Sequence, residues 1–267
     1  MTLTKLTTRI VEKPWGRKGI DPRFGADPNV QIGEIWFEDP DHRPLDVMIK
    51  YLFTTERLSV QVHPDDATAH ARGLRSGKSE CWIVLEADDD AEIGIGTTRE
   101  VSTDEVIAAA RDGSIVDLID WRKPKAGDFL YNSAGTIHAL GPGLTVIEVQ
   151  QAIDLTYRLY DYGRPRELHL EEARDVLIGE PHRDPLDGAI DRDRTRILAD
   201  QGHFGLAWCH HSAPPIGTKR ELQLLPIDSA MTVDGIALKP GECALYNGEP
   251  DSLRSDGNFV LAWSRGD

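Results

Sequence analysis

Short segments of β-branched and aromatic residues, separated by glycine and proline, run through most of this chain and constrain its fold more than any other feature. The chain has 24 glycines and 16 prolines, and they interrupt the apolar segments repeatedly. This pattern is typical of an all-β sandwich or barrel, because helices need longer uninterrupted runs. The candidate strands are residues 45–53, 57–63, 81–87, 91–97, 128–132, 135–140, 143–152 and 155–162. The sequence therefore predicts a mainly β protein.

Two segments between these strands predict short helices. Residues 102–113 begin with Ser102 followed by acidic residues, which favour a helix N-terminus, and end at Gly113, which favours a C-terminus. Residues 168–179 have the same design and end at Gly179.

A charged, proline-containing stretch, residues 180–196, predicts a boundary between two units. Beyond it short strand-like segments resume, and LKPGECALYN (238–247) is similar to KPKAGDFLYN (123–132). We therefore expect a larger unit at residues 1–180 that carries the site, and a smaller, degenerate β unit at residues 181–267. The second unit has no histidine or acid placed like those of the first, so we expect it to be structural.

Composition narrows the classes of function. The formal charge of −15 argues against general nucleic-acid binding, which requires a basic surface. No stretch reaches the roughly 18 apolar residues of a membrane helix, and no secretory signal is visible, so we expect a cytoplasmic protein. Cys81, Cys209 and Cys243 form no CxxC pair and predict neither disulfides nor a thiolate metal site.

Four polar residues together suggest a metal site. In LSVQVHPDD (58–66) side chains two apart point the same way, so Gln61 and His63 share a face of the strand, which Pro64 ends. Glu80 precedes another strand, and His138 lies among glycines. Each has an ordinary structural explanation when taken alone. Together, two imidazoles, a carboxylate and an amide oxygen make a suitable divalent-metal site that leaves a position for substrate.

Cations accompany this set. Lys78 is two residues before Glu80, and Arg158 points away from both of its neighbours on a predicted strand. Most such charges are solvated surface groups. Lys50 differs because its segment, DVMIKYLF, is nearly apolar, and a lysine there requires an explanation.

Five motifs carry a resemblance to a known family. They are KPWG, QVHPDD, GKSECW, GTIHALGPG and VIEVQQAIDLTYRLYDYGR. With them the chain resembles type I phosphomannose isomerases, particularly the short bacterial form, over most of residues 10–175. The resemblance implies a cupin-type double-stranded β-helix (jelly-roll) barrel. It implies one zinc ion bound by Gln61, His63, Glu80 and His138, and the interconversion of mannose 6-phosphate and fructose 6-phosphate.

The resemblance also implies catalytic positions. Arg158 matches the family's essential arginine, and Asp154, Glu148 and Lys78 match its nearby acids and lysine. We expect the metal to polarise a substrate oxygen and Arg158 to stabilise the developing negative charge. Glu148, Asp154 and Lys78 all stay candidates for the base that moves the carbon-bound proton.

Lys50 and Ser59 match substrate-binding positions, Ser59 as a phosphate contact. Two positions depart from the family pattern. Arg17 stands where many members have a second glycine in the KPWG region. Gly77 stands where some members have a histidine, so a proton-shuttling role given to that histidine does not apply here.

Two other readings of the same residues compete with the isomerase. One is a cupin-type non-haem metal oxygenase, in which two histidines and a carboxylate hold iron(II). Gln61, Lys50 and Arg158 argue against it, because oxygen chemistry on an apolar substrate needs none of them. The other is a non-catalytic sugar-binding cupin. The sequence leaves open whether the protein is a monomer or a homodimer.

Overall fold

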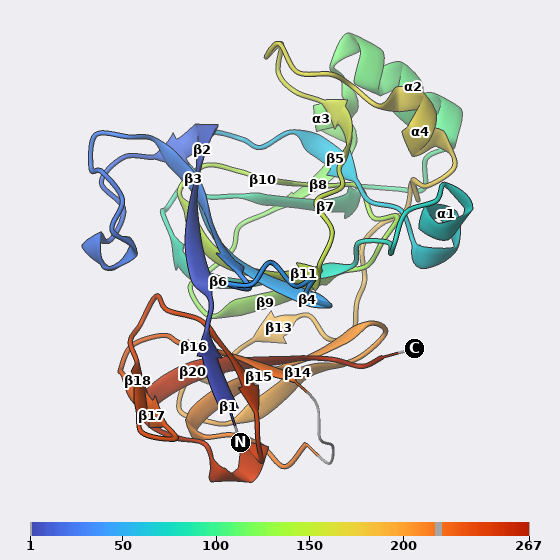
Figure 1. The fold of residues 1–267 in the computed structure, drawn as a ribbon. Coiled ribbons are helices and arrows are strands. Elements are labelled where there is room, and N and C mark those ends of the chain that lie inside the picture. The colour runs from blue at the N-terminus through green and yellow to red at the C-terminus, as the bar shows by residue number, and fades with distance from the viewer. Residues whose placement is uncertain (1, 217–220, 267) are drawn as a thin grey trace.

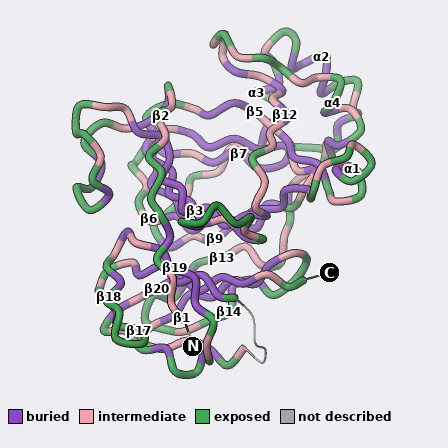
Figure 2. Tube along the Cα trace, viewed as in Figure 1, coloured by how far each residue is buried: buried purple, intermediate pink, exposed green. Residues whose placement is uncertain are grey.

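Three stacked antiparallel sheets, with short helices over the outermost, form the architecture of this computed structural model (Figure 1). It describes residues 2–216 and 221–266. The predicted mainly β fold is confirmed. Figure 2 shows that the buried residues follow the sheets and that the exposed residues lie in the outer connections and along edge strands.

The central sheet has seven strands, and both of its faces are covered. In spatial order they are β13 (Gly188–Ala189), β9 (Asp128–Asn132), β6 (Glu80–Ala87), β11 (Leu144–Gln151), β4 (Val47–Phe53), β3 (Ile32–Glu38) and β2 (Thr7–Arg17). Every residue of β11 is buried. Its alternate side chains enter different cores: Ile147 packs toward the C-terminal sheet and Val146 toward the five-stranded sheet.

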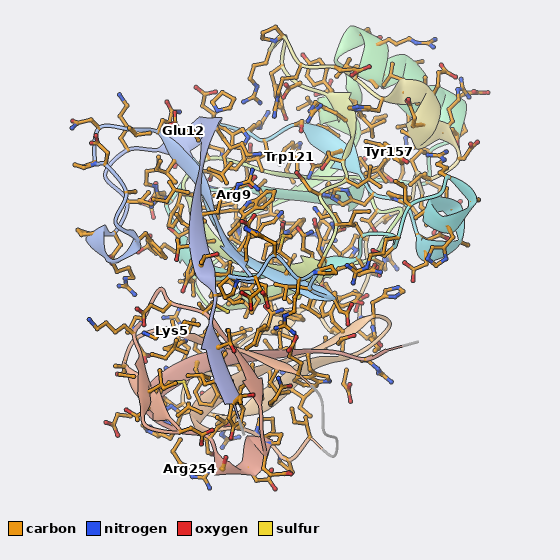
Figure 3. The ribbon with its side chains drawn as sticks, in the orientation of Figure 1. Lys5, Arg9, Glu12, Trp121, Tyr157 and Arg254 are labelled. Carbon is orange, nitrogen blue, oxygen red and sulfur yellow. The ribbon has the colours of Figure 1, made fainter. Side chains whose placement is uncertain are left out.

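The five-stranded sheet forms the opposite wall of the barrel. Its strands are β12 (Tyr157–Tyr160), β5 (Val60–Val62), β10 (His138–Leu140), β7 (Ile93–Thr97) and β8 (Ile119–Arg122). Tyr157 and Trp121, labelled in Figure 3, belong to its two edge strands. Its outer face packs against α2 (Thr103–Asp112), α3 (Ile115–Leu118) and α4 (Leu170–Arg174). Val60 and Val62 face these helices, so Gln61 faces the barrel interior.

The third sheet belongs mainly to the C-terminal part of the chain. Its strands are β1 (Thr2–Lys5), β19 (Ala244–Asn247), β16 (Leu222–Pro226), β20 (Arg254–Ser264), β15 (Phe204–Ser212) and β14 (Arg196–Gln201). The remaining elements are β17 (Met231–Val233), β18 (Ile236–Leu238), α1 (Asp66–Ala71), η1 (Pro22–Phe24) and η2 (Pro250–Ser252). The two expected units exchange strands. The N-terminal strand β1 joins the third sheet and β13 joins the central sheet, so the chain crosses between the two expected units twice. The boundary at residue 180 stays a prediction.

The two similar decapeptides adopt the same local structure. Asp128 accepts a hydrogen bond from the backbone N–H of Lys125 (2.7 Å), and Glu242 accepts one from Lys239 (2.8 Å). Each turn contains a glycine with positive φ and leads into a strand, β9 or β19.

Of the two predicted helices, the first is confirmed. Ser102 caps α2 by accepting a hydrogen bond from the N–H of Glu105, and Gly113 ends it with φ of 88°. The second prediction is wrong in length, because α4 ends at Arg174. Ile178 instead donates to the carbonyl of Gly135 and forms an isolated parallel β-bridge with Thr136, while the carbonyl of Gly179 accepts from Val101. None of the helices in the described residues has the length and apolarity to cross a membrane.

Candidate active site

Two rows of polar side chains face each other across the barrel. On the five-stranded sheet, Gln61 of β5 pairs with His138 of β10 and with Arg158 of β12. On the central sheet, Glu148 of β11 pairs with Lys50 of β4 and with Trp82 of β6. Directly opposite residues on neighbouring strands have adjacent side chains, so each row is continuous.

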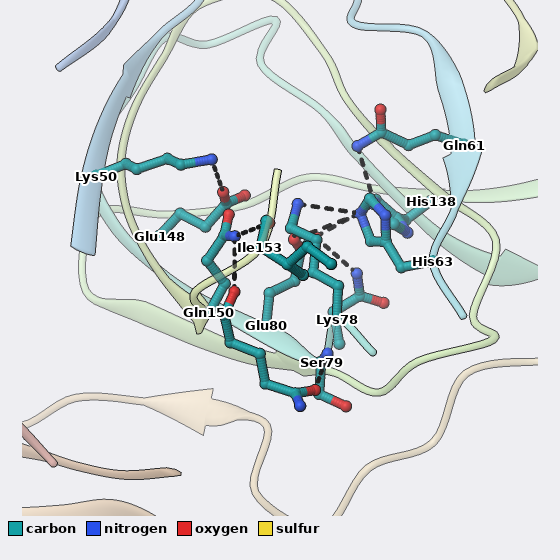
Figure 4. Close-up of polar contacts among 12 residues, drawn as sticks. Lys50, Gln61, His63, Lys78, Ser79, Glu80, His138, Glu148, Gln150 and Ile153 are labelled. Carbon is teal, nitrogen blue, oxygen red and sulfur yellow. Dashed lines mark hydrogen bonds and ion pairs between the residues drawn. The ribbon is translucent and has the colours of Figure 1, made fainter. Parts of the chain in front are cut away.

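A cavity of about 280 Å³ lies between these rows. The predicted residues that line it are Lys50, Ser59, Gln61, Lys78, His138, Glu148, Asp154 and Arg158. His63 and Glu80 are buried behind this wall and contact Lys78 and His138. The structure therefore brings all ten predicted site residues together, and Figure 4 shows the central ones.

His63, Glu80 and His138 form a buried cluster that can hold a metal ion, with one ligand atom from each lying within 4.8 Å of the others. The two carboxylate oxygens of Glu80 face different imidazoles. Oε1 lies 3.2 Å from Nε2 of His138, and Oε2 lies 3.5 Å from Nε2 of His63. Oε2 forms an ion pair but no hydrogen bond, and Nδ1 of His63 is buried without a partner.

The environments of the two histidines keep a nitrogen lone pair available. Nδ1 of His138 lies 2.9 Å from the carbonyl of Thr136 and donates to it, which leaves Nε2 unprotonated on the neutral ring. Burial, together with the nearby Lys78 ammonium, lowers the pKa of His63 to about 3. His63 is therefore neutral at pH 7, the form that binds metals.

The side-chain amide of Gln61 lies at the edge of this cluster, next to His138. Its Nε2 is 3.1 Å from Nε2 of His138, and its Oε1 accepts a hydrogen bond of 3.3 Å from Ser59. Rotating the amide by a half-turn exchanges these atoms and directs the oxygen toward the cluster. The position is compatible with the predicted fourth ligand.

Lys78 is the positive partner of Glu80. Its Nζ lies 2.8 Å from Oε2 of Glu80 and 3.2 Å from Nε2 of His63. Burial opposes the charge of Lys78, but Glu80 and Glu148 outweigh burial and raise its pKa. Burial also opposes ionisation of Glu80, yet Lys78 and the histidines lower the pKa of this carboxyl well below its ordinary value. The pair is ionised at neutral pH.

Glu148 occupies the middle of the central-sheet row. It accepts a hydrogen bond of 3.1 Å from the indole of Trp82 and lies 3.6 Å from Nζ of Lys50. Lys50 in turn lies 4.4 Å above the ring of Trp36. Burial and the charge of Glu80 raise the pKa of Glu148. A carboxyl with a raised pKa in a cavity is a candidate general base.

Arg158 faces the cavity from β12. Its Nη1 donates to the carbonyl of Glu167 (2.8 Å), and its Nε is buried without a partner. Among the described residues no carboxylate forms an ion pair with it, and burial and the neighbouring Arg166 lower its pKa. Asp154 is exposed at the rim of the cavity.

Sequence reasoning missed several residues that line the cavity, among them Lys13, Trp15, Glu34 and Arg166. Lys13 forms an ion pair of 3.4 Å with Glu34. Lys13 and Trp15 belong to the KPWG motif, so this motif could have indicated that they line the site. Glu34 and Arg166 carry no signal that separates them from other strand and loop charges.

Comparisons with known proteins agree on one family. The chain is 35% identical over 216 residues to a mannose-6-phosphate isomerase of Streptococcus mutans, covering 66% of this chain and 68% of that protein. The crystal structure of the Bacillus subtilis mannose 6-phosphate isomerase matches with a TM-score of 0.77 and 26% identity, over 98% of this chain and 99% of that one. A zinc-bound mannose 6-phosphate isomerase matches with a TM-score of 0.72 and 15% identity, over the full length of both chains. No protein-family model matches. The structural likeness confirms the predicted cupin-type barrel.

Proposed function

The chain belongs to the mannose-6-phosphate isomerase family, and from this premise we propose that it interconverts mannose 6-phosphate and fructose 6-phosphate with one bound zinc ion. The observation that supports this most strongly is the His63, Glu80 and His138 cluster beside a cavity lined by cations and a buried carboxylate. An anionic sugar needs the cations, and proton transfer between adjacent carbons needs the carboxylate.

The donor set suits zinc. His63, Glu80 and His138 would hold it with Gln61, because two neutral imidazoles and a carboxylate are ordinary zinc ligands. Glu80 adds a buried carboxylate whose two oxygens face different imidazoles of the cluster, so a cation between the three side chains would contact all of them. When bound, zinc supplies Lewis acidity toward a substrate oxygen.

Among the three candidates for the base, we favour Glu148. It is buried on the cavity wall and its pKa is raised, which makes it a stronger proton acceptor than an ordinary glutamate. The pKa of Lys78 is raised as well, which keeps Lys78 protonated and suits it to donating hydrogen bonds. Asp154 is exposed at the rim, where it is better placed to contact substrate than to remove a carbon-bound proton.

The remaining cations divide between charge stabilisation and binding. Arg158 is the cross-strand partner of Gln61, so its guanidinium lies beside the expected metal ligand and can stabilise negative charge that develops on the sugar oxygens. We assign the phosphate to Ser59 and Arg166, which line the same cavity. Lys50 contacts the sugar and pairs with Glu148.

A coupled assay on mannose 6-phosphate tests the proposal directly. Isomerisation should disappear after chelation and return with zinc, while circular dichroism shows the barrel still folded. Arg158→Ala should lower kcat far more than it raises KM. Full activity in the chelated protein would overturn the role of zinc, and no activity in the zinc-loaded protein would overturn the proposed function. A change in KM alone would make Arg158 a phosphate anchor. A cytoplasmic location, and a monomer or homodimer, stay predictions from the sequence.

A further inference from the structure

Asp66 lies outside the cavity, three residues after His63, yet it contacts the segment that carries Lys78 and Glu80. Its Oδ1 accepts a hydrogen bond of 2.6 Å from the backbone N–H of Gly77. The same oxygen accepts a second hydrogen bond, of 2.9 Å, from Nε2 of Gln151 at the end of β11. One carboxylate oxygen therefore connects the turn before β6 to the central sheet.

The turn packs closely against the backbone around Asp66. Lys78 donates its N–H to the carbonyl of Pro64 (2.9 Å). A Cβ on Gly77 would lie 2.6 Å from the same carbonyl oxygen, well inside van der Waals contact. This close approach requires glycine at position 77 and leaves the Gly77 N–H with Asp66 as its acceptor.

Gln151 extends the contact to the next residue of the turn. Its Oε1 accepts from the N–H of Ser79 (2.8 Å), while its Nε2 donates to Asp66. Ser79 Oγ accepts from the N–H of Ala134 (3.2 Å). The residues on both sides of Lys78 are thus fixed by hydrogen bonds that originate at Asp66 and Gln151.

The second oxygen of Asp66 contacts the C-terminal part of the chain. Oδ2 lies 3.0 Å from Nδ1 of His203, in the turn before β15. Burial opposes ionisation of Asp66, but hydrogen bonds from Gln151 and Gly77 outweigh it and lower the pKa of this carboxyl. The carboxylate is therefore ionised at neutral pH. It contacts Gly77 and Gln151 through one oxygen and His203 of the C-terminal part through the other.

We propose that Asp66 is a positioning residue that fixes residues 77–80, and through them the Lys78 ammonium and the Glu80 carboxylate, in the arrangement that binds metal. The proposal concerns the same site as the proposed function and rests on it for the identity of the metal. Outer partners that orient metal ligands commonly change metal affinity by about 10- to 100-fold when they are lost. Asp66 acts on the site only through the turn.

The chain offers a matched control one residue away. Asp65 caps α1 by accepting from the N–H of Thr68 (2.8 Å). Asp65→Ala therefore disturbs the same helix without touching residues 77–80. Asp66→Asn is the conservative variant, because its remaining oxygen can still accept from Gly77 and Gln151.

The test measures zinc affinity by competition with a chelating dye, and hydrogen–deuterium exchange of residues 74–80 in metal-free protein. We expect Asp66→Ala to weaken zinc binding at least about tenfold and to speed exchange at Gly77. Asp66→Asn should retain wild-type values, and Asp65→Ala should leave both measurements unchanged.

Equal zinc affinities and exchange rates for Asp66→Ala and Asp65→Ala would overturn the proposal. They would show that Asp66 affects the site only by stabilising its helix. If Asp66→Ala does not fold, Asp66→Glu displaces both oxygens while keeping the charge, and unchanged zinc affinity in that variant overturns the proposal equally. Neither measurement uses a sugar. A wild-type protein inactive on mannose 6-phosphate would therefore defeat the proposed function without deciding the role of Asp66.

Discussion

Replacing Lys78 by methionine tests the electrostatic account of the site. Lys78 and Glu80 are 5% and 0% exposed, and their charged atoms lie 2.8 Å apart. At an effective dielectric constant of about 20, this separation corresponds to an attraction of about 6 kcal/mol. In metal-free protein the variant leaves Glu80 buried without its ion-pair partner. Losing one member of such a pair typically destabilises a protein by about 3–5 kcal/mol.

Proton uptake by Glu80 limits this loss and makes it depend on pH. An unfolded glutamate has a pKa of about 4.3, so keeping it protonated at pH 7 costs about 4 kcal/mol, and at pH 5.5 about 1.6 kcal/mol. In the wild type the lowered pKa of Glu80 keeps this carboxyl ionised across that range. The folded variant binds one proton more than its unfolded state, so its free energy of unfolding falls relative to wild type as pH rises.

Urea denaturation of Lys78→Met and wild type at pH 5.5 and 7, with and without zinc, measures these differences. We expect a deficit of about 4 kcal/mol at pH 7 in chelated protein, less than about 2 kcal/mol at pH 5.5, and a smaller deficit with zinc because the metal then balances Glu80. Lys50→Met is the control, since Lys50 pairs with Glu148 and its deficit should not respond to zinc. A Lys78→Met deficit that is the same in all four conditions would refute the reasoning.

Three further variants test separate parts of the structure. Leu159→Ala, fully buried between the five-stranded sheet and the helices, should lower the free energy of unfolding by about 2–5 kcal/mol in urea denaturation. Ser102→Ala removes the α2 cap and should reduce stability by about 1 kcal/mol with kcat unchanged in the isomerase assay. Gly77→Ala should displace the turn and weaken zinc binding in dye competition, and wild-type affinity would contradict the close packing seen there.

Features set by local chemistry were predictable from the sequence. Strand alternation placed Gln61 on the cavity side, and the neighbouring Val60 and Val62 are fully buried against the helices. The cap residues of α2 predicted both of its ends, because Ser102 and Gly113 act within the helix itself. These signals need no information about distant residues.

Features set by tertiary contacts were not predictable. The helix predicted over residues 168–179 covers only Leu170–Arg174, because Ile178 and Gly179 form backbone hydrogen bonds with Gly135 and Val101, which lie far away in the sequence. The Lys13–Glu34 ion pair joins adjacent strands, so neither residue alone indicates its partner. The role we propose for Asp66 likewise depends on a turn that returns from residue 77, which no spacing in the sequence reveals.

Lys50 shows how the layers of the fold produce the site. In most sheets a polar residue alternates with apolar ones because one face meets water. Both faces of the central sheet are covered here, so Ile49 and Tyr51 enter the apolar core beneath the C-terminal sheet while Lys50 enters the barrel. A charge placed there must be paired, and Glu148 provides the partner on the next strand. The C-terminal sheet therefore serves the site without contributing to its ligands, because it removes water from the outer face and leaves the inner face as the polar one.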